Sequence, residues 1–463
     1  MNSHAGTPQD TLDYFQNWLS YRRWFLRIPG VQVAVAVAGE QRISAAFGKA
    51  DASTGELLGT QHLFRIASHS KTFTAVAVLQ LLEQGRVRLD DTVATHLAEL
   101  AGGRIGEVTV RELLSHGGGV IRDSEDGDFW QLHRDFPDRA ELIRVAAAPS
   151  AAVLARNDRF KYSNIAYGLL GLIIEAVTGS SYADSVNETI VDRLGLRDTG
   201  PDLPEQRRAD LAAGHSSLSY APDRTVIDHV RTGALASATG FYATAADLVA
   251  FFTALLPGET RLLTEDSLRQ LRHRAWQVKD AEVGYGLGVF LNRIGDRDLI
   301  GHGGGYPGHI TRTLACLESR VVVAVLTNAI DGAAESLATA LFRLLDLGAG
   351  ATHEPAEDAG RFTGRFSWLW GVQDVALIDG HLFAVNPTAL NPADDAAPLE
   401  VVDGSTLKIV GGPGGGAVGE LMHYDLAPDG SIRTVRGGSG MTMTPFIHPT
   451  SAPTSRARPD RPR

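Results

Sequence analysis

The sequence has 463 residues, 44% of them hydrophobic, and a formal net charge of −11. This length is sufficient for one large domain and a smaller one. The acidic balance argues against nucleic acid or an anionic membrane as the main partner, so we expect neither. The single cysteine, Cys316, excludes a disulfide framework within the chain, and its apolar neighbours are typical of a buried strand position.

The first residues, MNSHAGTPQDTLDYFQNWL, do not combine a basic segment with an apolar one as a signal peptide does. No apolar run reaches the length of a membrane span. We therefore expect a cytoplasmic protein.

The N-terminal part predicts a helix over residues 11–25, where apolar residues recur at helical spacing. The segment VQVAVAVAGEQRISAAFGKAD then predicts a β-hairpin that turns at Gly39 and Glu40. A buried helix over residues 72–84 follows, with Gly85 as its stop signal.

Residues 92–275 are expected to be mostly helical with long loops, and Thr244 is a candidate N-cap. From residue 284 the pattern changes to strand-like segments joined by short turns, followed by a helix over residues 333–345. These strands would join the N-terminal hairpin in one antiparallel sheet. The expected fold class is therefore α+β, with the helical region inserted between the two parts of the sheet.

After residue 347 the sequence predicts a separate module. Residues 348–360 resemble a linker, and residues 361–448 contain short strand-like runs with Gly and Asp turns, typical of a small all-β barrel. The Arg- and Pro-rich end, residues 449–463, is expected to be disordered. Residues 1–347 would form the main domain.

The first candidate site lies in FRIASHSKTFTA, where Ser68 and Lys71 are three residues apart and share a face of a helix. A serine at a helix start meets a positive dipole and free N–H groups. A buried lysine one turn later can hold or accept the hydroxyl proton. Lys71 is one of five lysines and has apolar neighbours, although an exposed surface lysine is the alternative explanation.

Two further motifs carry suitable chemistry. In KYSN, Tyr162 can relay a proton if a nearby ammonium lowers its pKa, and Asn164 can bind Lys71 and a substrate carbonyl. In GHGGGYPGH, the N–H of Gly305 can pair with that of Ser68 as an oxyanion hole, and His302 can bind the Tyr162 hydroxyl or a substrate carboxylate. Each motif alone is also explained by an ordinary helix start or hairpin turn.

In the order S-x-x-K, Y-x-N, H-x-G, the three motifs resemble the serine β-lactamase and penicillin-binding-protein superfamily. The resemblance covers roughly residues 15–347. It is closest to the class C-like branch, which also contains D-aminopeptidases, D-alanyl-D-alanine carboxypeptidases and family VIII-type carboxylesterases. The module after residue 360 resembles the lipocalin-like barrels appended to some members.

The resemblance implies that Ser68 is the acylated nucleophile, that Lys71 and Tyr162 share acid and base work, and that Asn164 positions the substrate amide. It implies no metal and no organic cofactor. The third motif has His302 where β-lactamases usually have a lysine that binds the antibiotic carboxylate. H-x-G is familiar from D-aminopeptidase-like and some esterase-like members.

We therefore expect a serine hydrolase that acts through an acyl-enzyme on a small amide or peptide, preferably one containing a D-amino acid. A carboxylesterase on short acyl esters is the first alternative, and a β-lactamase or a non-catalytic scaffold is the second. Phe129 and Trp130 are candidate walls of the substrate pocket. The expected partner is a small-molecule substrate, and a homo-oligomer is possible.

Overall fold

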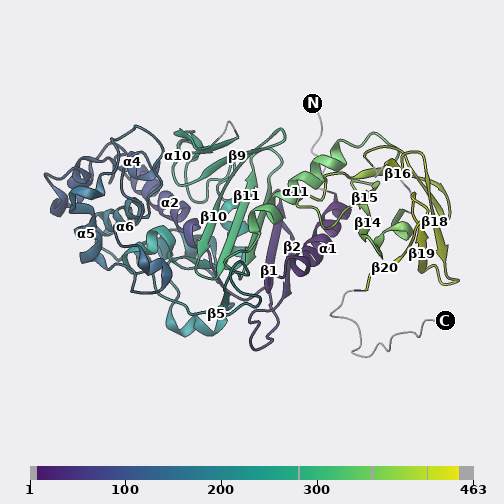
Figure 1. The fold of residues 1–463 in the computed structure, drawn as a ribbon. Coiled ribbons are helices and arrows are strands. Elements are labelled where there is room, and N and C mark those ends of the chain that lie inside the picture. Colours follow the sequence, from purple (N-terminus) through teal and green to yellow (C-terminus); the bar gives the residue numbers. More distant parts are fainter. Residues whose placement is uncertain (1–7, 280–281, 356–358, 414–415, 448–463) are drawn as a thin grey trace. The chain divides into compact units, whose positions relative to one another are not determined.

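The computed structural model describes residues 8–279, 282–355, 359–413 and 416–447 (Figure 1). The helices are α1 (Gln9–Phe25), α2 (Ser70–Glu83), α3 (Val93–His96), α4 (Val110–Leu114), α5 (Arg139–Ala147), α6 (Asn164–Thr178), α7 (Tyr182–Val186), α8 (Asp192–Leu194), α9 (Ala245–Thr253), α10 (Glu265–Arg272) and α11 (Ala334–Ala349). The chain divides into two compact units. One extends from Leu19 to Phe342, and the other combines Pro8–Trp18 with the chain from Arg343 onward.

The first unit is built on an eight-stranded antiparallel sheet in the order β2-β1-β12-β11-β10-β9-β8-β7 (Figure 1). Its strands are β1 (Gly30–Val37), β2 (Glu40–Gly48), β7 (Trp276–Gln277), β8 (Val283–Tyr285), β9 (Phe290–Ile294), β10 (Arg297–Tyr306), β11 (His309–Cys316) and β12 (Val321–Thr327). The N-terminal hairpin joins the later strands through β1 and β12, with Val33 opposite Val325. The α+β prediction is confirmed, as is the buried strand position of Cys316.

The helical region lies between the two parts of the sheet in sequence, as expected. Its centre is α2, whose residues from Ser70 to Leu81 are all buried. The helix is enclosed because its buried part is mostly apolar on every side, apart from the hydroxyl residues, Lys71 and Gln80. The predicted cap is also present, since the Thr244 side chain accepts a hydrogen bond from the Asp247 N–H at the start of α9.

This region also contains two short antiparallel strand pairs. They are β3 (Phe64–Arg65) with β6 (Tyr242–Ala243), and β4 (Gly214–His215) with β5 (Val226–Ile227). β3 ends at Arg65, three residues before Ser68, and therefore helps to fix the approach of the chain to α2.

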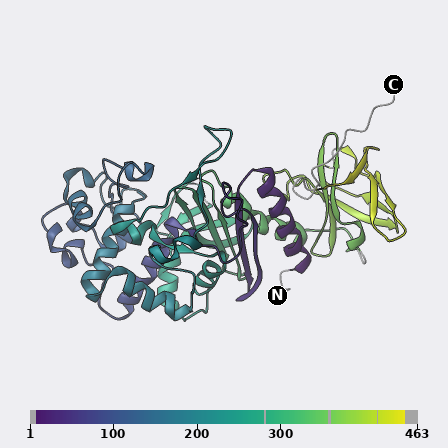
Figure 2. The same cartoon turned by 90° about the horizontal axis from the view of Figure 1, so that it is seen from below.

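The second unit contains a closed eight-stranded antiparallel barrel, which confirms the predicted barrel module (Figure 2). Its strands are β13 (Gly364–Trp368), β14 (Gly371–Ile378), β15 (His381–Val385), β16 (Ala397–Asp403), β17 (Thr406–Ile409), β18 (Leu421–Leu426), β19 (Ile432–Arg436) and β20 (Thr442–Pro445). Its interior is filled by side chains such as Phe366, Leu399 and Tyr424. Helix α11 continues to Ala349, so the predicted linker begins inside a helix. The predicted tail, residues 449–463, lies outside the described residues.

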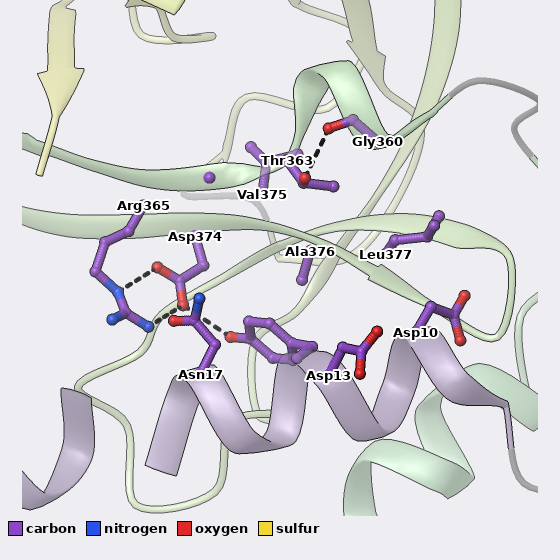
Figure 3. A pocket seen from close by; sticks show the side chains of 12 residues that line it. Asp10, Asp13, Asn17, Gly360, Thr363, Arg365, Asp374, Val375, Ala376 and Leu377 are labelled. Atoms are coloured by element: carbon purple, nitrogen blue, oxygen red, sulfur yellow. Dashed lines mark hydrogen bonds and ion pairs between the residues drawn. The ribbon is translucent and has the colours of Figure 1, made fainter. Parts of the chain in front are cut away.

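The start of α1 packs on the outside of this barrel, beside a cavity of about 400 Å³ (Figure 3). Arg365 on β13 forms a two-bond ion pair with Asp374 on β14, at 2.7 and 2.8 Å. The Tyr14 hydroxyl donates to the same carboxylate at 3.0 Å. Burial raises the pKa of Asp374, and the Arg365 guanidinium opposes that rise.

In the described residues no single helix is long and apolar enough to cross a bilayer. One bent pair, α6 with the helical segment Tyr182–Leu194, meets the criterion by length and composition only.

Candidate active site

A strained turn places Ser68 at the entrance of α2. After β3, Ala67 adopts a left-handed backbone conformation with φ of 46°, which is unusual for a residue other than glycine. Residues Ala67–His69 form one turn of 3₁₀ helix that leads into α2. Ser68 is partly exposed while both of its neighbours are buried, so its hydroxyl is open to a substrate.

Lys71 lies one turn further on and is completely buried. Its Nζ donates to Ser68 Oγ at 3.2 Å, to Asn164 Oδ1 at 2.7 Å and to the Ala238 carbonyl at 2.8 Å. Burial lowers the pKa of Lys71 well below its ordinary value, and the positive charge of Arg122 lowers it further, whereas the Asp123 carboxylate raises it. The lysine is therefore held by three acceptors, in a buried position that lowers its pKa.

Helix α6 brings Asn164 to this lysine. Ser163 caps the helix by accepting from the Ala166 N–H, and Asn164 is the first helical residue. While Asn164 Oδ1 accepts from Lys71, its Nδ2 donates to Asp123 Oδ1 at 2.6 Å. Both ends of this amide are thus occupied within the protein.

Tyr162 lies over the same lysine, with Lys71 Nζ 4.7 Å from the centre of its ring. The guanidinium carbon of Arg122 lies 5.2 Å from that centre. The phenol also makes a side-chain hydrogen bond with Ser68. Tyr162 is therefore in contact with the serine hydroxyl and with two cations.

Strand β10 passes against the chain just before Ser68. Gly304 approaches Ile66 so closely that a Cβ atom at this position would lie 2.9 Å from the Ile66 carbonyl carbon. The next residue, Gly305, is exposed and is paired with Ile310 of β11. The glycines of the third motif therefore allow the strand to run directly along the nucleophile segment.

Residues 17–347 match the family model described as Beta-lactamase. The chain belongs to the beta-lactamase family. The superfamily consists of serine hydrolases that act on amides and esters.

The relatives of this beta-lactamase-family protein have names that refer to different functions. It is 29% identical to penicillin-binding protein 4 of Amycolatopsis lactamdurans over 334 residues, which are 69% of this chain and 85% of that protein. It is 32% identical to esterase EstB of Burkholderia gladioli over 195 residues, which are 38% of this chain and 47% of the esterase. The solved structure of a D-stereospecific amidohydrolase from Streptomyces sp. aligns with a TM-score of 0.60 and 27% identity, over 71% of this chain and 96% of that one.

Two details of this beta-lactamase-family site differ from the sequence-based expectation. The pKa of Tyr162 is raised rather than lowered, because burial outweighs the hydrogen bond to Ser68 and the charge of Arg122. His302 is almost completely buried; its Nε2 faces the Tyr285 hydroxyl at 3.5 Å and its Nδ1 faces the Gly303 carbonyl at 2.7 Å. Burial also lowers the pKa of His302 well below its usual range.

The site contains residues that the sequence did not single out. Arg122 and Asp123 form an ion pair at 3.2 Å on the loop after α4. Trp130, a predicted pocket wall, donates through Nε1 to Asp123 at 2.9 Å. Phe129 is buried and packs against Phe136 instead. The only sequence signal for this loop is the acidic run DSEDGD, which does not indicate which carboxylate turns inward.

No group of His, Cys, Asp or Glu suited to a metal ion occurs among the residues that the structure describes. His116 is buried beneath Tyr162, with ring centres 4.4 Å apart, and its Nδ1 accepts from the Ser163 N–H. Burial and the charge of Lys71 lower the pKa of His116 well below its ordinary value, which favours the neutral ring.

Proposed function

We propose that this protein is a serine hydrolase that forms an acyl-enzyme on Ser68 and cleaves small amides carrying a D-amino acid. The observation that carries the proposal is the completely buried Lys71, held at 3.2 Å from Ser68 Oγ with a strongly lowered pKa. The lowered pKa makes the neutral amine of Lys71 more accessible than that of an exposed lysine, and a neutral amine beside a hydroxyl is a general base.

In the proposed reaction the Ser68 proton moves to Lys71 while Oγ bonds to the substrate carbonyl carbon. The N–H groups of Ser68 and Gly305 stabilise the oxyanion. The leaving amine takes a proton from the Tyr162 hydroxyl, and Lys71 returns its proton to that hydroxyl. Water then attacks the acyl group and releases Ser68. Because its pKa is raised, Tyr162 acts as a proton donor and relay, and Lys71 is the base.

The charges around the site support a preference for substrates with a cationic group. His302 is buried with a lowered pKa, so this position of β10 offers no fixed cation to a substrate carboxylate. Asp123 supplies a carboxylate that is connected to Lys71 through Asn164. Its present ion-pair partner, Arg122, is 61% exposed and can be exchanged for a ligand. A free α-ammonium, as in an amino acid amide, matches this carboxylate.

The D configuration rests on similarity to the D-stereospecific amidohydrolase, and hydrolysis of short esters is the second candidate because of the similarity to esterase EstB. The cytoplasm remains the proposed location, and cell fractionation tests it.

The test compares kcat/KM for D-phenylalanine amide, its L isomer, N-acetyl-D-phenylalanine amide and 4-nitrophenyl butyrate. We expect at least about tenfold preference for the D amide over both other amides, and loss of that preference in Asp123→Asn. The matched control is Asp128→Asn, because Asp128 is an exposed carboxylate on the same loop. Equal rates for D and L amides, or turnover of the ester alone, would contradict the proposed substrate.

A further inference from the structure

The apolar side chains exposed on the barrel are concentrated at one of its two ends. All neighbouring strands of the barrel are antiparallel, so successive connections alternate between the ends. The β13–β14, β15–β16, β17–β18 and β19–β20 connections therefore share one end, here called the loop end. Its exposed large apolar residues are Leu369, Trp370, Leu390, Val418, Leu421 and Met441.

Two of these side chains project almost completely into solvent. Leu369 is 91% exposed and Trp370 is 79% exposed at the tip of the β13–β14 hairpin. Leu390, in the β15–β16 connection, is 65% exposed. At the opposite end, where the Gly380 N–H donates to Asp10 of α1, the only large apolar side chains exposed among the described residues are Val402 and Ile447. Folding of the barrel does not require the larger number of exposed apolar side chains at the loop end, because other residues already fill its core.

The size of the patch fits a protein–protein contact. Trp370 alone presents on the order of 200 Å², because an aromatic side chain offers about 150–250 Å² and this one is 79% exposed. Five further large apolar side chains are exposed at the same end. Summed over the loop end, the exposed apolar area reaches at least the few hundred Å² that a monomer ordinarily exposes in one patch, and it is of the same order as the roughly 800 Å² that each partner contributes to a stable interface.

The charges around the loop end favour a second copy of this chain. The described residues of the four connections include three exposed carboxylates, on Asp394, Asp395 and Glu420, which disfavour an anionic membrane. Two exposed cations, Lys408 and Arg436, lie on the strand ends beside them. A rim that contains both signs can pair with the same rim rotated about a two-fold axis.

We propose that the loop end is a self-association surface, through which two copies of this protein contact each other with Leu369 and Trp370 at the centre. Aromatic and large apolar side chains that lie at the centre of an interface contribute most of its affinity. The contact is isologous, so each copy presents the same hairpin to the other. This inference does not depend on the proposed activity.

The test is sedimentation velocity of the full chain from 1 to 100 µM, as wild type, Trp370→Asp and the matched control Val402→Asp. We expect wild type to associate, Trp370→Asp to raise the dissociation constant at least about 30-fold, and Val402→Asp to behave as wild type. Both substituted side chains are exposed, so circular dichroism should be unchanged.

A second measurement covers the case in which an aspartate disturbs the hairpin. Because Cys316 is buried, Trp370→Cys introduces one accessible thiol, and its oxidation should yield a disulfide-linked dimer that Val402→Cys does not form. A monomeric wild type at every concentration, or equal effects of the two aspartate variants, would overturn the proposal. So would binding to phosphatidylcholine vesicles that Trp370→Asp abolishes, because the occupant would then be lipid.

Discussion

Replacing Gly304 by alanine should separate strand β10 from the nucleophile segment. An added Cβ would lie 2.9 Å from the Ile66 carbonyl carbon and closer still to its oxygen, whereas ordinary contact begins at 3.4 Å. The Thr311 Oγ1, which would also crowd the added Cβ, can rotate away, but the Ile66 carbonyl is backbone and cannot. Relief requires a displacement of about 1 Å between the segment that carries Ser68 and the strand that carries Gly305.

A displacement of that size should lower both the catalytic rate and the stability of the protein. Misplacing reacting groups by about 1 Å reduces catalysis by about 100-fold, and overpacking destabilises a core by about 1–3 kcal/mol. Gly303→Ala is the matched control, because the nearest atom to its Cβ would be the Thr311 carbonyl oxygen at 3.6 Å, an ordinary contact. We expect the control to stay within about threefold of wild type.

The assay is the second-order rate of Ser68 labelling by a fluorophosphonate, with the melting temperature measured on the same samples. Labelling reports on the nucleophile and the oxyanion site without requiring the natural substrate. If Gly304→Ala reacted as fast as Gly303→Ala with the same melting temperature, the close approach of β10 to the nucleophile would have no functional role.

Three further results are expected. The rate of Ser68 labelling should rise with pH as Lys71 loses its proton, and it should level off well below the ordinary lysine pKa. Asp123→Asn removes the charge that raises the pKa of Lys71, so the rise should move to lower pH. An unmoved profile in this variant would contradict the electrostatic role of Asp123. Arg365→Met leaves Asp374 buried without its cation and should lower the free energy of unfolding in urea by about 3–5 kcal/mol. Adding Asp374→Leu should recover part of this loss. A loss below about 1 kcal/mol in Arg365→Met would show that the ion pair is dispensable. Cys316, buried on β11, should react with Ellman's reagent only as the protein unfolds, and rapid reaction of the native protein would contradict its burial.

Much of the fold is predictable because local patterns agree with the tertiary structure. The short valine-rich runs VQVAVAV and VVVAVLT identify two strands that prove to be neighbours, as β1 and β12. The Ala-, Val- and Leu-rich sequence of α2 similarly predicts a buried helix. Closure of the barrel is harder to predict from the sequence, because its strands are short and the strand pattern of each one is weak.

The surroundings of the site are less predictable because they depend on how loops fold back. Asp123 is one of several carboxylates in an acidic loop, and it turns inward because Asn164 and Trp130 donate to it. The pKa of Tyr162 depends on burial as well as on neighbouring charges, and a sequence motif shows only the charges. The orientation of His302, toward Tyr285 rather than solvent, is set by alternation along β10 and by its aromatic neighbours.

The most direct test of the central proposal is the intact mass of the protein after incubation with a fluorophosphonate, followed by peptide mapping. We predict one covalent adduct per chain, located on Ser68, absent in Ser68→Ala and formed far more slowly in Lys71→Arg. An adduct on another residue, or no adduct on folded wild-type protein, would contradict an acyl-enzyme mechanism at Ser68.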